Sequence, residues 1–176
     1  MTNINFLNNK PLCRITGEPL IPIIDFGQQP LGNGFLLQEN FKNEYFYQMQ
    51  IGFSKKSFML QLIEQPKPEQ MFHENYAFHS STSSRMEMHF RELARSIIDS
   101  EIVNKNPFVV ELGCNDGILL RHFAEGKIRH LGIEPSKNVA KLANKQGVRT
   151  VSKFFSEELA QQILKNDGPV DVFLAI

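Results

Sequence analysis

The sequence predicts an α/β protein: a small, loop-rich β domain followed by the first half of a parallel sheet with flanking helices. Segments typical of strands and helices alternate from Phe108 to Ile176, the pattern of parallel strands joined by right-handed crossovers. A turn that begins and ends with glycine, Gly113–Gly117, follows the first of these strands. The region from Pro11 to Leu62 is instead rich in Gly, Pro, Phe and short apolar runs, which indicates short strands joined by turns.

A connector separates the two parts. Pro66 and Pro68 lack backbone donors and restrict the residues before them, so we expect 65–69 to form neither a helix nor a strand ladder. The run Ser84–Glu87 fits a capping box, and apolar residues at helical spacing follow it, which predicts a helix over about 85–99. The expected division is a β domain at 1–66, a connector with its helix at 67–104, and the α/β domain at 105–176.

The α/β domain is expected to contain four strands and three helices. Ser136 and Ser156 each precede a helical pattern and are suited to cap it, and Gly147 suits the residue just past a helix end. The expected strands are Phe108–Leu112, Leu131–Ile133, Val148–Val151 and Val170–Ile176. The expected helices are Ile118–Ala124, the one from Ser136 through Ala143, and the one that begins at Ser156.

Composition and charge exclude several classes of protein. The chain is 41% apolar and 22% charged, as ordinary globular proteins are, and nowhere do about 18 apolar residues run together. Nineteen basic residues balance nineteen acidic ones, so we expect neither a nucleic-acid partner nor a membrane partner. Cys13 and Cys114 are too few for a disulfide framework, and Met1–Lys10 lacks the pattern of a leader, so we expect a cytoplasmic protein.

The turn after the first α/β strand is the most informative stretch. In open α/β sheets ligands bind beyond the carboxyl ends of strands, where glycines let the backbone approach them closely. The spacing from Gly113 to Gly117 is Gly-x-x-x-Gly, which differs from the dinucleotide fingerprint and lacks the Gly-Lys-Ser/Thr end of a phosphate loop. S-adenosylmethionine has no phosphates and fits better, with backbone amides for its carboxylate and Glu111 near its ammonium group.

Glu134 stands at the end of the second α/β strand, 21 residues after Gly113 (134 − 113). An acid at that place can accept hydrogen bonds from both hydroxyls of a ribose. The alternative is that Gly113 and Gly117 only make a tight turn and that Glu134 is a solvated acid at a strand end. A third class, an NAD-dependent oxidoreductase, shares the α/β pattern but is disfavoured by the glycine spacing.

Several motifs in combination resemble those of the sugar C-methyltransferases, a family that acts on nucleotide-linked deoxysugars. The resemblance covers nearly the whole chain. It implies a Rossmann-like fold, S-adenosylmethionine as the cofactor and a nucleotide-sugar as the substrate. The motifs that carry it are Glu111–Leu120, Gly132–Ala140, Phe26–Leu31, Leu60–Leu62, Met71–Tyr76 and Ser80–Ser83.

The resemblance also implies a set of site residues. Glu134 would hold the cofactor's ribose, and Phe154 with Phe155 would border the adenine, although ordinary core aromatics are an equal alternative for the two phenylalanines. Tyr76 matches a tyrosine that faces the sugar, and its alternative is a purely structural role. The catalytic residues stay unassigned. The residues expected around the cofactor's methionine end are Glu111, Gly113, Asn115 and Gly117, and Asp116 is a further expected cofactor-binding residue.

The N-terminal part departs from the family at its metal site. The family binds zinc there through two Cys-x-x-Cys pairs, but the corresponding pairs here are Cys13 with Thr16 and Ser54 with Ser57. One thiolate cannot build a tetrahedral zinc site, so we predict a degenerate zinc-binding-type domain without zinc. Burial must then hold this domain together, and the expected contributors are Phe26, Phe35, Phe53, Phe58 and Leu60.

The function expected from these observations is S-adenosylmethionine-dependent C-methylation of a nucleotide-linked deoxysugar. The sequence stops at Ile176 within the expected fourth strand, so we expect a chain truncated before its catalytic half and inactive by itself. Self-association or a complementary C-terminal chain would cover the unpaired strand. The alternative function is a non-catalytic remnant that binds an adenosyl ligand or a partner.

Overall fold

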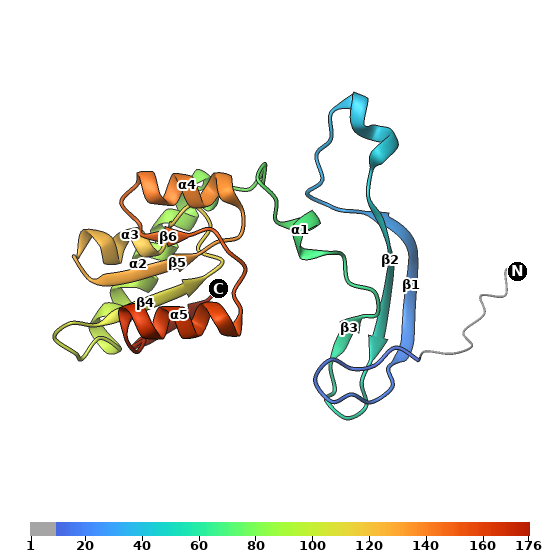
Figure 1. Cartoon of the computed structure of the whole chain (residues 1–176), viewed down its shortest axis with the longest axis horizontal. Helices are drawn as coiled ribbons and strands as arrows, with labels where there is room; N and C mark the ends of the chain where they lie inside the picture. The colour runs from blue at the N-terminus through green and yellow to red at the C-terminus, as the bar shows by residue number, and fades with distance from the viewer. Residues whose placement is uncertain (1–9) are drawn as a thin grey trace, which may run out of the picture. The chain divides into compact units, whose positions relative to one another are not determined.

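The computed structural model describes residues 10–176, and the chain divides into two compact units, Met1–Met71 and Phe72–Ile176 (Figure 1). The expectation that the N-terminus carries no leader falls on Met1–Asn9, outside the described residues, and stays a prediction. No helix within the described residues is both long enough and apolar enough to span a membrane.

The first unit is a three-stranded antiparallel sheet. Strand β2 lies in the middle and pairs with β1 on one side, from Ile21 opposite Phe53 to Pro30 opposite Phe46, and with β3 on the other. A short 3-10 helix, Gln38–Asn43, lies in the connection between β1 and β2. The small β domain predicted from the sequence is confirmed. Its strands are β1 Ile21–Pro30, β2 Phe46–Phe53 and β3 Leu60–Leu62.

The apolar core predicted for this unit is wrong. Phe26, Phe35, Phe58 and Leu60 are 50%, 74%, 80% and 63% exposed, and Phe53 is only half-buried against the edge of the Phe58 ring. The described helices of this unit are four and six residues long, too short to cover a sheet face, so the sheet has no second layer to bury these rings against. The residues that are buried instead are Cys13, Leu20, Ser54 and Gln61.

The connector contains a short helix, α1, at Pro68–Met71. The expectation that 65–69 forms no helix is therefore wrong at its C-terminal end. Proline is tolerated in the first turn of a helix, because the amide it lacks would have no partner inside the helix there. Pro68 thus begins the helix that it was expected to prevent.

The second unit is a parallel four-stranded sheet in the order β6-β5-β4-β7. The chain moves outward from β4 through β5 to β6 and then returns to place β7 on the other side of β4, so the strand order reverses at β4. This is the doubly wound, Rossmann-like topology, and the turn after β4 lies where such sheets bind ligands. The strands are β4 Phe108–Leu112, β5 Arg129–Ile133, β6 Thr150–Val151 and β7 Val172–Ala175.

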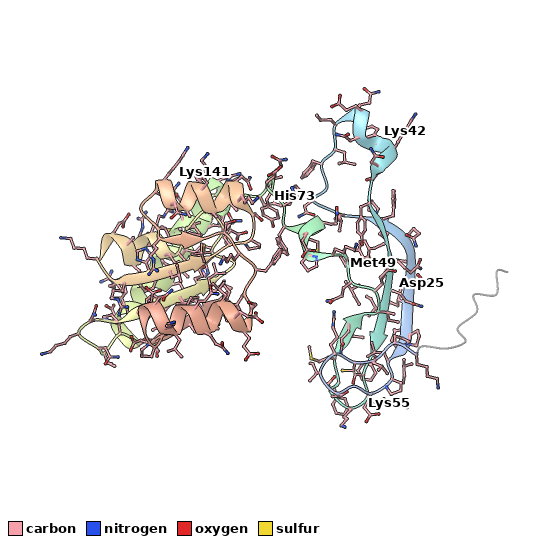
Figure 2. The ribbon with its side chains drawn as sticks, viewed as in Figure 1. Asp25, Lys42, Met49, Lys55, His73 and Lys141 are labelled. Atoms are coloured by element: carbon pink, nitrogen blue, oxygen red, sulfur yellow. The ribbon has the colours of Figure 1, made fainter. Side chains whose placement is uncertain are left out.

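Helices cover both faces of this sheet. On one face Phe90 and Ala94 of α2 pack with Phe123 of α3 around Val109, and on the other α5 packs on Phe108 and Val110 (Figure 1). Lys141 projects from the outer side of α4 (Figure 2). The three-layer arrangement explains why this unit, unlike the first, buries its large apolar residues. The helices are α2 Ser84–Ser100, α3 Leu120–Glu125, α4 Lys137–Lys145 and α5 Glu157–Asp167.

Two of the three predicted helix caps differ from expectation. Ser83 rather than Ser84 caps α2, with its hydroxyl accepting from the Met86 amide, so Glu87 lies one residue too late for a capping box. Ser136 stands at the cap position of α4, but its side chain makes no cap hydrogen bond. Ser156 caps α5 by accepting from the amide of its third helical residue, and Gly147 is left-handed just past α4, both as predicted.

Candidate cofactor-binding site

The two glycines of the turn after β4 have different roles. Both are left-handed, with φ of 66° at Gly113 and 81° at Gly117. A Cβ on Gly117 would lie 2.9 Å from the Val148 side chain, whereas a Cβ on Gly113 would meet no atom within 4 Å. Gly117 is therefore required for close packing of the turn on the domain core, and Gly113 leaves an open approach to the backbone.

Glu134 joins the turns that follow β4 and β5. Its carboxylate is 4% exposed; one oxygen accepts from the Asn115 amide at 3.1 Å and the other from the Ser136 amide at 2.8 Å. A carboxylate has about four acceptor positions, so two remain for a ligand. Both strand-end turns are thus fixed around one acid that can still accept from a ribose.

Glu111 lies beneath the turn as the fourth residue of β4. It is 4% exposed, and its Oε2 has no hydrogen-bond partner among the described residues. Burial, followed by the negative charge of Glu134, raises the pKa of Glu111 to about 8. The carboxyl is therefore mostly protonated at neutral pH, and a cation bound nearby would favour its ionised form.

Asn115 and Asp116 point toward the segment that precedes α2. The Asn115 side chain accepts from the Ser80 amide at 3.0 Å and donates to the Phe78 carbonyl at 3.1 Å. Asp116 is fully buried, and its Oδ2 accepts from the amide and the hydroxyl of Ser81 at 2.9 and 2.6 Å. The structure therefore engages both side chains with the protein's own backbone, which the sequence did not indicate.

Tyr76 lies in an aromatic cluster beside Glu134. Its ring centroid is 5.8 Å from that of Phe72 and 5.7 Å from that of Phe78, and Phe154 contacts Phe72 at 6.4 Å. Burial, and then the charge of Glu134, raise the pKa of Tyr76. The phenol is therefore within electrostatic range of the acid expected to hold the ribose, and Phe154 belongs to the same cluster.

Phe155 occupies a different place from Phe154. Its ring lies 5.8 Å from that of Phe173 and lines a cavity of about 80 Å³ with Val110 and Ile163, on the face of the sheet covered by α5. The structure thus brings Phe154, but not Phe155, to the aromatic cluster. Sequence reasoning missed Asn138, which donates to the Tyr76 carbonyl at 2.7 Å; its place two residues into the helix after Glu134 was the available signal.

The positions where the resemblance implies zinc ligands lie in two loops of the first unit. Cys13 Sγ lies 3.5 Å from the Ser57 hydroxyl and accepts from Gln61 Nε2 at 2.9 Å. A hydrogen bond from Thr16, with further ones from Ser57, Gln61 and Ser54, lowers the pKa of Cys13 to about 5 against the opposing effect of burial. One thiol and three hydroxyls do not fit zinc, and no cluster of three metal-ligating side chains occurs within residues 10–176.

The strand order and the glycine turn at the reversal point define the second unit as a doubly wound, Rossmann-like domain. Residues 13–72 match a family model described as "Putative zinc binding domain". Over 158 residues the chain is 25% identical to the C-methyltransferase NovU of Streptomyces niveus. The alignment covers 89% of this chain and 37% of NovU. The resemblance to the N-terminal region of sugar C-methyltransferases is thereby confirmed, and the chain spans about a third of the length of that relative.

The solved structures that the chain resembles are more distant in sequence. The plantazolicin methyltransferase BpumL in complex with SAH aligns with 52% of this chain and 35% of its own at 16% identity and a TM-score of 0.35. The magnesium protoporphyrin IX methyltransferase ChlM of Synechocystis PCC 6803 with bound SAH aligns with 51% and 34% at 14% identity and a TM-score of 0.30. YjhP from E. coli aligns with 44% and 33% at 16% identity and a TM-score of 0.32. The fold class therefore rests on the strand order and not on these alignments.

Proposed function

We propose that the second unit binds S-adenosylmethionine and that the chain is the cofactor-binding part of a methyltransferase. The observation that carries the proposal is Glu134, a buried acid that fixes the turns after β4 and β5 and keeps acceptor positions free. The open backbone at Gly113 suits the cofactor's carboxylate, and Glu134 suits its ribose. When bound, the cofactor supplies a methyl group on a positively charged sulfur.

Calorimetry of the purified chain with S-adenosylmethionine, S-adenosylhomocysteine and NAD tests this proposal. We expect the two adenosyl compounds to bind and NAD not to. Glu134→Ala should weaken binding about tenfold or more, because two ribose hydrogen bonds to a charged group are worth about 1.5 to 3 kcal/mol. Glu134→Gln keeps the shape but turns an NH2 donor toward one of the two backbone amides that Glu134 accepts from, so it should weaken binding as well. Binding of NAD without S-adenosylmethionine would instead indicate an oxidoreductase.

Glu111 supplies a second, independent measurement. The ammonium and sulfonium groups of the cofactor favour its ionised form, so binding at pH 7 should release a proton from a carboxyl whose pKa is about 8. Calorimetry in buffers of different ionisation enthalpy measures that proton. Glu111→Gln should abolish its release, and release that persists in this variant would remove Glu111 from the site.

The substrate that we propose is a nucleotide-linked deoxysugar methylated on carbon, by resemblance to the sugar C-methyltransferases. Tyr76 is the group that we expect to face the sugar. Its raised pKa keeps the phenol protonated at neutral pH. We expect the 176-residue polypeptide to bind the cofactor without turnover. A methyl-transfer assay with a 4-keto-deoxysugar nucleotide checks this, and turnover by this polypeptide alone would contradict it.

We further propose that the first unit holds no zinc, because the set of donors around Cys13 is unsuitable for it.

We also propose that a second polypeptide segment, from another copy or a complementary chain, pairs with β7. This strand lies at the edge of the sheet, where Phe173 and Ile176 are 51% and 65% exposed. Light scattering over a range of concentrations measures self-association, and addition of a candidate C-terminal chain measures the other arrangement.

A further inference from the structure

Residues 76–81, here called the strap, are held to the rest of the second unit through four of their backbone groups. Asn138 donates to the Tyr76 carbonyl, Asn115 donates to the Phe78 carbonyl and accepts from the Ser80 amide, and Asp116 accepts from Ser81. The side chains that hold the strap come from the turn after β4 and from the start of α4, which follows β5. The strap therefore crosses the edge of the sheet where the candidate cofactor site lies.

The burial of these side chains indicates that the attachment is built in. Asp116 is fully buried, and its Oδ2 takes both donors of Ser81 while its Oδ1 has no partner in the described part of the chain. Burying a carboxylate is costly unless it is hydrogen-bonded, so the two bonds to Ser81 compensate for its position. An acid so placed stabilises the strap more than a solvent-exposed one would.

The same attachment fixes the aromatic cluster. Asn138 and Asn115 hold the backbone carbonyls of Tyr76 and Phe78, whose rings contact each other at 5.7 Å. We propose that Asn115, Asp116 and Asn138 are positioning residues that hold the strap against the cofactor turn and thereby place the Tyr76 phenol beside Glu134. A ligand that orders the turn then orders the strap as well, because Asn115 belongs to the turn and its side chain is hydrogen-bonded to the strap.

Hydrogen exchange of the whole chain without ligand tests the attachment directly. Asn138→Ala should speed exchange in the peptide that spans 76–82 about tenfold, because it removes one anchoring bond. Asn144→Ala is the matched control, because Asn144 also lies on α4 and donates to backbone carbonyls, but to those of Ala140 and Thr150. Unchanged exchange over 76–82 in Asn138→Ala would overturn the proposal.

Two substitutions at Asp116 distinguish the loss of its contact with the strap from a general loss of stability. Asp116→Asn keeps an oxygen that can accept from Ser81 and should leave exchange of the strap within about threefold of the wild type. Asp116→Ala should release the strap, and Ser81→Ala, which removes only the hydroxyl donor, should have an intermediate effect. Equal loss of protection in the Asn and Ala variants would show that Asp116 acts otherwise.

The ionisation of Tyr76 reports its position. A difference titration against Tyr76→Phe isolates its phenol, and Asn138→Ala should lower its pKa toward the ordinary value as the ring leaves Glu134 and the buried cluster. Asn144→Ala should leave it unchanged. A Tyr76 pKa that stays raised after the strap is released would overturn the placement of the phenol by these residues.

The expectation that a bound ligand orders the strap rests on the proposed function. Addition of S-adenosylhomocysteine should slow exchange over 76–82 in the wild type, and Asn138→Ala should bind it about five- to tenfold more weakly. If the wild type binds no adenosyl compound, the proposed function fails, whereas the exchange and titration results still decide whether the strap is held as proposed. Binding that leaves strap exchange unchanged would overturn the coupling alone.

Discussion

The two units differ in the interactions that hold their loops together. In the second unit a buried sheet with helices on both faces supports a turn whose Asn115 and Asp116 side chains are hydrogen-bonded to residues 78–81. In the first unit two loops meet at Cys13, which contacts the Ser57 hydroxyl and Gln61, while large apolar side chains of the sheet stay exposed. The comparison teaches that loops can be fixed either on a layered apolar core or through a few buried polar contacts.

The largest effect is expected in the second unit. Gly117→Ala should lower the free energy of unfolding by about 2 to 3 kcal/mol, because the new methyl group meets Val148 at 2.9 Å in a left-handed conformation. Gly147→Ala is the control: it shares the positive φ but meets nothing within 4 Å, so about 1 kcal/mol is expected. Denaturant unfolding measures both, and equal losses would show that packing at Gly117 is unimportant.

A pH-dependent effect in the same unit follows from Glu111, whose folded pKa of about 8 lies above its ordinary value. Between those two pKa values the folded state binds the proton and the unfolded state does not, so stability falls as the pH rises from about 5 to 8. The slope contributed by one such group is at most about 1.4 kcal/mol per pH unit. Thermal unfolding should show this fall in the wild type and less of it in Glu111→Gln. Glu92→Gln, at an exposed acid of α2, should behave as the wild type.

The next test addresses the first unit. Gln61 is 6% exposed, donates to Cys13 and accepts from the Arg14 amide, so Gln61→Ala should destabilise that unit by about 1 to 2 kcal/mol. Gln48→Ala, at a glutamine of the same sheet with exposed hydrogen bonds, should cost less than about 0.5 kcal/mol. Amide signals from β2 followed through thermal unfolding report on this unit. Equal effects would mean that Gln61 does not hold the two loops.

The smallest expected effect is none. Chelation should leave the thermal midpoint unchanged, because one thiol and three hydroxyls do not make a zinc site. Stoichiometric zinc in elemental analysis, or a large loss of stability with chelator, would contradict the proposal. Changing Thr16, Ser54 and Ser57 together to cysteine should restore zinc binding if the loops keep their geometry.

Local patterns predicted the second unit better than the first. Strand β4 has the predicted bounds because its apolar run is short and bounded, and Ser156 caps α5 because its neighbours offer no competing hydroxyl. The α2 cap was misplaced by one residue because Ser83 and Ser84 are equally capable in sequence. Phe58 was expected in a core because an aromatic residue looks the same in sequence whether or not a second layer covers it.

In the candidate site, too, the places of some residues could be predicted from the sequence and those of others could not. Glu134 and Gly113 were predicted because their places follow from strand ends, which the chain order determines. The hydrogen bonds that attach Asn115 and Asp116 to residues 78–81 join positions about 35 residues apart, and no periodicity carries that information. Phe154 and Phe155 are adjacent in sequence, yet only the fold shows that they serve different parts of the domain.

The edge position of strand β1 matters while the chain is being synthesised. It is an edge strand with exposed isoleucines, and it is synthesised before its partner strand β2 and before the second unit. Its pairing register shifts twice, between Pro22 and Ile24 and between Asp25 and Gln28. Irregularities of this kind twist an edge and hinder its pairing with another chain. They would therefore limit clumping between nascent copies on one messenger RNA, and a regularised β1 should raise the yield of inclusion bodies during rapid expression.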